Sequence, residues 1–253
     1  MKTKLLTTLL ALTLGACGGG GGGGGNSSSS APAPSVLQGV YQGTLSTGTA
    51  ENSIVLEDGT FWNIYGVLSG ATLLVQGVAT GTSNANNGTF TMSFTDFPAL
   101  GATPVSGQGS GIYSASGLIG MMVENSVTGT FNLTAPVQAT YNYGTVAAIS
   151  SISGSWSGYL LDGETSTISI LADGTLSGTS SLGCAFSGTA TPRPSGKNIF
   201  NVSLTFGAAP CLFPSQTTTG IGITYPLGNG KNQLIVGQTV SGQTKATAFF
   251  AVR

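Results

Sequence analysis

Hydrophobic and polar residues alternate along much of the chain beyond residue 36 with the period of a β-strand. In Thr89-Phe90-Thr91-Met92-Ser93-Phe94 every second residue is apolar, so Phe90, Met92 and Phe94 would point to one face of a strand. Between such runs lie turns with an Asx-Gly pair, which supplies the positive φ angles of a tight hairpin: Asp58-Gly59, Asp162-Gly163, Asp173-Gly174 and Asn229-Gly230. The pattern predicts a string of antiparallel hairpins.

The same pattern occurs twice. Gly39-Val-Tyr41-Gln-Gly43 matches Gly154-Ser-Trp156-Ser-Gly158, and Asp58-Gly59-Thr60 matches Asp173-Gly174-Thr175, both at an offset of 115 residues. Two separate motifs in one register indicate an internal repeat. We therefore predict two homologous domains.

We place the first domain at residues 36–135, a linker at 136–149 and the second domain at 150–253. Each copy divides into about eight short strands, which in the first copy are expected at 38–45, 52–57, 60–67, 73–80, 88–95, 107–114, 117–124 and 127–134. Eight meandering antiparallel strands can close into a small barrel, which leaves no exposed edge. We predict two linked barrels in an all-β fold, and a pair of sandwiches would give nearly the same pattern.

Composition agrees with strands rather than helices. The chain has 41 Gly residues and is rich in Ser and Thr, which disfavour helices, and its 40% hydrophobic residues suffice for a packed core. Residues 17–192 contain all eight carboxylates and no Lys or Arg, whereas residues 193–253 contain five basic residues. Five scattered cations do not form a nucleic-acid site. We interpret the asymmetry as a weakly charged surface with no electrostatic partner, and the alternative is that the two halves attract each other.

The N-terminus has the pattern of an export signal. Lys2 and Lys4 precede an apolar run at residues 5–14, which is too short to span a bilayer. The run ends in Leu14-Gly15-Ala16-Cys17, which resembles the lipobox of bacterial lipoproteins. The resemblance implies a signal peptide at 1–16 and a diacylglycerol group on Cys17, which would anchor the protein to a membrane.

A Gly/Ser/Pro segment at residues 17–35 follows and includes an uninterrupted glycine run at 18–25. With nothing to bury, this segment is expected to be a flexible tether. Gly18 stands where inner-membrane lipoproteins commonly have Asp, so the resemblance points to the outer membrane, with the cell surface favoured over the periplasmic face.

Three features of the chain resemble bacterial surface lipoproteins with β-barrel domains. They are the tether, the opening Gly-x-aromatic-x-Gly strand, and the strands that begin Gly88-Thr-Phe90 and Gly129-Thr-Phe131. Such β-barrel domains include the barrel lobes of transferrin-binding protein B. The resemblance implies display at the outer membrane and protein binding. No transferrin-contacting residue is carried over.

Catalytic chemistry has few candidates here. The chain has no histidine, which excludes Ser-His-Asp and Cys-His mechanisms. A glycosidase needs only two carboxylates, but most of the eight stand at expected strand ends or turns, and hairpin geometry explains Asp58, Asp162 and Asp173. Each Asp-containing turn offers one or two oxygen ligands, whereas calcium takes six to eight. We expect no enzyme, no metal and no cofactor.

Cys184 and Cys211 remain once Cys17 carries lipid. A disulfide between them is expected in an exported protein, whereas a redox pair would show Cys-x-x-Cys spacing. The bond would close a loop of about 28 residues and stabilise the second domain by roughly 3 to 4 kcal/mol.

One aromatic cluster occurs in the first copy only. Phe61, Trp62 and Tyr65 are the ligand-binding candidates, because the second copy has Leu176, Ser177 and Ser180 in their places. On this hypothesis Trp62→Ala weakens binding and leaves the thermal midpoint nearly unchanged. The other aromatic residues are expected to be core, above all Tyr41 and Trp156, which occupy equivalent positions in the two repeats.

Together these features predict a non-enzymatic, lipid-anchored outer-membrane lipoprotein that acts as a surface binding or adhesion module. Its partner would be an unknown protein or glycan. The alternative is a periplasm-facing structural or carrier lipoprotein that binds a small apolar ligand in a barrel cavity.

Overall fold

A computed structural model describes residues 37–99, 103–136 and 141–253. The expected signal peptide, Cys17 and the whole of the expected tether lie outside the described residues, as does part of the expected linker. Both barrels described below belong to one compact unit.

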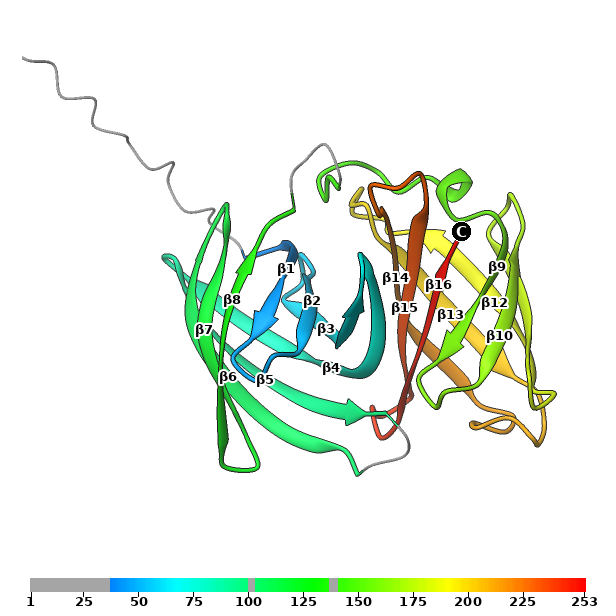
Figure 1. Ribbon diagram of the computed structural model, residues 1–253, viewed down its shortest axis with the longest axis horizontal. Coiled ribbons are helices and arrows are strands. Elements are labelled where there is room, and N and C mark those ends of the chain that lie inside the picture. Colours follow the sequence, from blue (N-terminus) through cyan, green and yellow to red (C-terminus); the bar gives the residue numbers. More distant parts are fainter. Residues whose placement is uncertain (1–36, 100–102, 137–140) are drawn as a thin grey trace, which may run out of the picture. The chain divides into compact units, whose positions relative to one another are not determined.

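The first barrel is a closed antiparallel meander in which each strand pairs with the next and β8 returns to β1 (Figure 1). Its strands are β1 (Gly39–Leu45), β2 (Ala50–Val55), β3 (Thr60–Ser69), β4 (Thr72–Asn86), β5 (Thr89–Pro98), β6 (Val105–Ser114), β7 (Gly117–Glu124) and β8 (Val127–Thr134).

The second barrel has the same order and closes where β16 pairs with β9. A single 3₁₀ turn, η1 (Ile149–Ser151), precedes it. Its strands are β9 (Gly154–Leu160), β10 (Thr165–Ile170), β11 (Thr175–Ser180), β12 (Ala185–Pro192), β13 (Phe200–Phe206), β14 (Thr217–Pro226), β15 (Asn232–Val240) and β16 (Ala246–Val252). The prediction of an all-β fold with two eight-stranded antiparallel barrels is confirmed.

The Asx-Gly pairs form the expected tight turns. At Asp58-Gly59 the carboxylate Oδ1 of Asp58 accepts a hydrogen bond from the backbone N–H of Thr60 at 2.9 Å, and Gly59 has a φ of 81°. Asp173 repeats this contact with the N–H of Thr175 at 2.8 Å. The side chain thus replaces a backbone acceptor in the turn, which fixes the register of the hairpin.

Apolar side chains fill the two barrels to different degrees. The interior of the second barrel contains Trp156, Phe186, Phe200, Phe206 and Phe249 among its buried residues. The first barrel has a smaller cluster built around Tyr41, Phe61, Phe90, Phe94 and Phe131. The space left at one end of the first barrel forms the candidate site described below.

A third apolar cluster joins the outer walls of the two barrels. Trp62 and Ile64 of β3 belong to it together with Ile221, Ile235 and Phe250 of the second barrel. Gly237 of β15 allows the close approach, because a Cβ there would lie 3.2 Å from the indole Cε3 of Trp62. The barrels therefore share a buried interface as well as a linker.

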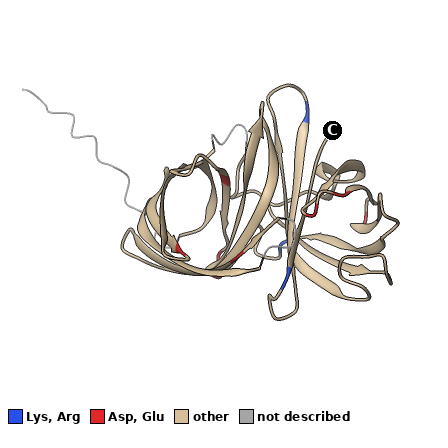
Figure 2. Cartoon of the chain, turned by 60° about the horizontal axis from the view of Figure 1, so that its bottom comes forward, with Lys and Arg blue, Asp and Glu red and all other residues tan. Residues whose placement is uncertain are grey.

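Polar contacts cross the same interface. Gln233 donates from Nε2 to the carbonyl of Leu73 at 2.8 Å and accepts at Oε1 from the N–H of Leu73 at 3.1 Å. Arg193 of the second half pairs with Glu57 at 2.7 Å and with Asp58 at 2.8 Å. The opposite charges of the two halves thus meet at this point, while the first barrel itself carries only acidic charge (Figure 2).

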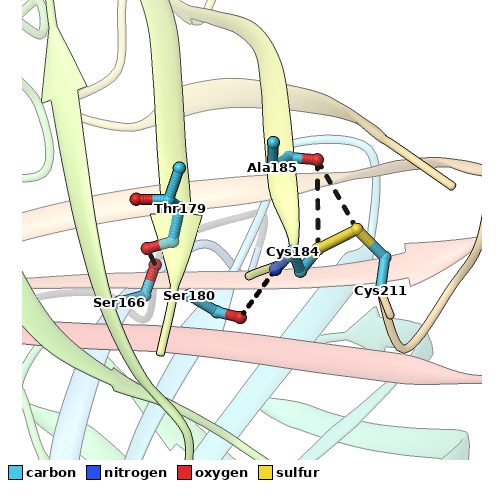
Figure 3. Close-up of a disulfide and its surroundings, with 6 residues drawn as sticks. All are labelled: Ser166, Thr179, Ser180, Cys184, Ala185 and Cys211. Atoms are coloured by element: carbon cyan, nitrogen blue, oxygen red, sulfur yellow. Dashed lines mark hydrogen bonds between the residues drawn. A yellow bond between two sulfur atoms is a disulfide. The ribbon is translucent and has the colours of Figure 1, made fainter. Parts of the chain in front are cut away.

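The predicted disulfide between Cys184 and Cys211 is confirmed, with a Cα–Cα distance of 4.5 Å. It ties the β11–β12 turn to the loop between β13 and β14 (Figure 3). In the same turn the hydroxyl of Ser180 accepts a hydrogen bond from the N–H of Cys184 at 3.3 Å (Figure 3). The disulfide therefore links two loops at the same end of the second barrel.

Within the part of the chain that the structure describes, no helix combines the length and the apolar character needed to cross a membrane.

Candidate functional site

The candidate site lies inside the first barrel, and strand register determines which side chains reach it. In the β2–β3 pair, Val55 stands opposite Phe61 and Glu51 stands opposite Tyr65. Residues paired in this way share a face. Val55 and Phe61 belong to the interior cluster, so Glu51, Tyr65 and the intervening Asn63 also face the interior.

A cavity of about 180 Å³ lies at this end of the barrel. Its polar lining comes from four strands and comprises Glu51, Asn63, Tyr65, Asp96 and Glu124. Its apolar lining includes Leu45, Ala79, Phe94 and Met122. Thr47, in the exposed turn between β1 and β2, also lines it, so the cavity reaches the surface there.

Two side chains in the cavity wall are buried without a complete set of partners. Glu51 is 5% exposed and Asn63 is 8% exposed. Among the described residues, Oε2 of Glu51 and Oδ1 of Asn63 have no hydrogen-bond partner. A buried polar atom without a partner costs free energy, and such atoms are rare in folded proteins. Burial also raises the pKa of Glu51 to about 7.

The other three polar groups, Tyr65, Asp96 and Glu124, affect one another. The hydroxyl of Tyr65 donates to Oδ1 of Asp96 at 2.8 Å, with Oδ2 at 2.9 Å. Burial raises the pKa of Asp96, although the bond from Tyr65 partly offsets this. Burial and the nearby Asp96 carboxylate likewise raise the pKa of Glu124. Asp96 and Glu124 are therefore neighbours in the cavity, and each carboxyl group affects the pKa of the other.

Gly77 allows Tyr65 to reach Asp96. These two residues lie on β3 and β5, and β4 runs between them. Tyr65 pairs with Gly77 on β4, where a Cβ would lie only 2.1 Å from the ring Cζ of Tyr65. The ring therefore lies directly over the β4 backbone, and any side chain at residue 77 would displace it.

The second barrel has no counterpart of this polar set. Ser166 stands opposite Ser180 in β10–β11, as Glu51 stands opposite Tyr65 in β2–β3. When Phe94 is aligned with Leu204, the strand pairing places Phe206 at the position of Asp96 and Val240 at that of Glu124. The carboxylates are thus a feature of the first barrel and not a requirement of the repeated fold.

The three residues predicted to bind a ligand do not form one patch. Phe61 points into the first barrel and is 2% exposed, whereas Trp62 points outward into the interface between the barrels and is 6% exposed. The expectation that Trp62→Ala leaves the thermal midpoint nearly unchanged is therefore revised. Tyr65 lines the cavity, and its role in binding stays a prediction.

Sequence reasoning missed Glu51, Asn63, Asp96 and Glu124 as site residues. The alternation identified at Phe90, Met92 and Phe94 extends by one step to Asp96, which places this carboxylate on the interior face. The same alternation in β7 runs from Leu118 to Glu124. A carboxylate at an inward position of a strand is the sequence signal that could have identified Asp96 and Glu124 as site residues.

The carboxylates of the described residues do not have the arrangement of a metal site. Among the residues described, no group of three His, Cys, Asp or Glu side chains is placed to hold a metal ion.

Larger hollows lie outside the barrel interiors, one on the wall of the second barrel and two lined by residues of both barrels. One of about 440 Å³ is lined by Ser157, Thr165, Thr179 and neighbouring residues of the second barrel. Its hydroxyl and backbone groups can bond to water, so they do not require a ligand. We therefore place the candidate site in the smaller cavity of the first barrel, where buried groups lack partners.

No family model matches the chain, and its sequence matches no curated protein. The resemblance to the barrel lobes of transferrin-binding protein B stays a prediction.

Proposed function

We propose that the protein is a non-enzymatic, lipid-anchored binding protein of the outer membrane, and that its first barrel holds the ligand. One observation carries the proposal. The first barrel keeps a cavity whose buried polar groups lack partners, whereas the second barrel has Ser, Phe and Val residues at the equivalent positions. In this proposal the second barrel supports the first through their shared interface.

The N-terminal sequence supports the proposed localisation at the outer membrane. Leu14-Gly15-Ala16-Cys17 directly follows the apolar run, and the Gly/Ser segment after Cys17 would hold the barrels away from the lipid. We propose display at the cell surface, where the ligand would be a molecule from the surroundings or part of a neighbouring cell. The absence of histidine supports a binding role over a catalytic one.

A second candidate is a carrier lipoprotein that faces the periplasm and holds a small ligand in the same cavity. The observation that favours it is the position of the cavity inside a barrel, where a small molecule is shielded from solvent. The two candidates differ in the side of the outer membrane on which the barrels stand.

Protease shaving of intact cells tests the proposed display, with a tag at the C-terminus and a periplasmic protein as the leakage control. We expect the tag to be lost from intact cells while the control survives. Cys17→Ser should release the protein from the membrane fraction, because the acyl chains would have no attachment site. Protection of the tag until the outer membrane is opened would contradict surface display and favour the carrier.

A further inference from the structure

The cavity of the first barrel contains acidic groups with no basic partner. Three carboxylates line it, contributed by Glu51 of β2, Asp96 of β5 and Glu124 of β7. Residues 37–134, which form the whole barrel, contain no Lys, Arg or His. Buried carboxylates that stay ionised are usually paired with a cation or with hydrogen-bond donors, so any positive charge that pairs with these groups must come from outside the barrel.

We propose that this cavity binds a small organic amine in its ammonium form, with the charged nitrogen placed among Glu51, Asp96 and Glu124. The inference rests on the proposed function, since it names the ligand class for the same cavity. It concerns the chemistry of the ligand and does not depend on which side of the membrane the barrel faces.

The unpartnered atoms indicate a ligand that donates hydrogen bonds. Oε2 of Glu51 and Oδ1 of Asn63 are both acceptors, and neither has a partner among the residues described. An ammonium group has several N–H donors, so it can serve these two atoms and a carboxylate of the Asp96–Glu124 pair together. An anionic ligand would place like charges side by side.

The remaining walls fit an apolar substituent. Leu45, Ala79, Phe94 and Met122 line the cavity, and the rings of Phe94 and Tyr65 offer aromatic surface of the kind that attracts ammonium groups. A cavity of about 180 Å³ is smaller than the roughly 300 to 1,000 Å³ of pockets for drug-sized ligands. The ligand should therefore be a small amine with a short apolar group.

Two features argue for an organic cation over a metal ion. No set of three potential ligand residues in the described part of the chain is arranged to hold a metal. In addition, hard cations such as calcium take six to eight oxygen ligands, and a lining that is partly aliphatic and aromatic offers no coordination. An organic ammonium ion can pair with the carboxylates through its nitrogen and can pack its apolar substituent against the aliphatic and aromatic lining.

Isothermal titration calorimetry of the full chain in a mild non-ionic detergent tests the proposal. The probes are benzylamine and benzyl alcohol, which have similar shapes but differ in charge. We expect benzylamine to bind at one site and benzyl alcohol to bind at least tenfold more weakly. Glu51→Gln should weaken benzylamine binding at least tenfold while barely changing that of benzyl alcohol. Circular dichroism would check that each variant folds.

Two further variants make the result specific. Glu124→Gln changes a half-buried group of the cavity and should also weaken benzylamine binding, which provides a second test if Glu51→Gln folds poorly. Glu164→Gln removes a carboxylate in the β9–β10 turn of the second barrel and should leave the affinity unchanged. This control separates local charge from net charge.

Equal affinity for the two probes would overturn the amine inference but leave the first barrel as a binding domain. Failure of benzylamine to bind at millimolar concentration would also overturn it, as would unchanged affinity in both cavity variants. Protease shaving tests the proposed display by a separate measurement, so either proposal can fail alone.

Discussion

At the scale of single residues, burial determines how the cavity carboxylates behave. Glu51 has a pKa near 4.5 when exposed, and burial raises it to about 7. Between these values the folded protein binds more protons than the unfolded chain, so stability falls as the pH rises. The loss continues until Glu51 is fully ionised, above about pH 7.

Glu51→Gln should remove this pH dependence. Glutamine has nearly the same shape and carries no charge, so the variant escapes the cost of ionising a buried carboxylate. We expect the wild-type protein to lose roughly 2 to 3 kcal/mol more than the variant between pH 5 and pH 8. Urea unfolding of both proteins at the two pH values measures this difference. Parallel losses would mean that Glu51 titrates as an exposed group.

Only part of the cavity could be predicted residue by residue. Tyr65 was identified because the second repeat has Ser180 in its place. Glu51, Asp96 and Glu124 stand at or next to the ends of the expected strands, and their inward direction depends on register. Asp96 follows the interior positions of β5 by one step, but Tyr65 reaches it only because Gly77 leaves room across β4.

At the scale of elements, β3 shows why the aromatic cluster does not act as one patch. Side chains of a strand alternate between its two faces, so Phe61, Asn63 and Tyr65 point inward while Trp62 and Ile64 point outward. Both faces of β3 are buried, one by the barrel interior and one by the second barrel. Sequence alone shows a run of apolar residues and not the two surfaces that cover it.

The outward face of β3 predicts a large effect for Trp62→Ala. Trp62 packs against Gly237 of β15, so truncation leaves a cavity between the barrels. We expect a loss of about 3 to 5 kcal/mol in unfolding free energy, measured by urea denaturation. Leu68→Ala on the same strand is the matched control, because Leu68 is 59% exposed and should change stability by less than about 0.5 kcal/mol. Similar small losses in both variants would argue against the interface.

Strand boundaries were predicted best for the last three strands of the first barrel. The strands expected at 107–114, 117–124 and 127–134 correspond closely to β6, β7 and β8. By contrast, the strand expected at 73–80 is β4, which extends over Thr72–Asn86. Its second half contains small and polar residues that give no hydrophobic signal, and pairing with β5 holds it in the sheet.

At the scale of the whole molecule, the internal repeat predicted the two-barrel architecture but not the different roles proposed for the two barrels. Two copies of one strand pattern predicted two barrels, and closure leaves no free sheet edge. The interface was not predictable, because outward apolar residues such as Ile64 and Ile235 read as ordinary strand core. The opposite charges of the two halves allowed an attraction, and Arg193 provides it through Glu57 and Asp58.

The central claim is that the first barrel binds the ligand in its cavity and that the second barrel stabilises the first through their shared interface. Amide hydrogen exchange of the full chain, with and without saturating benzylamine, tests this claim directly. The account predicts slower exchange in β2, β3, β5 and β7 around the cavity and unchanged exchange in β10 to β13. Slower exchange in the second barrel, or in neither barrel, would contradict the claim.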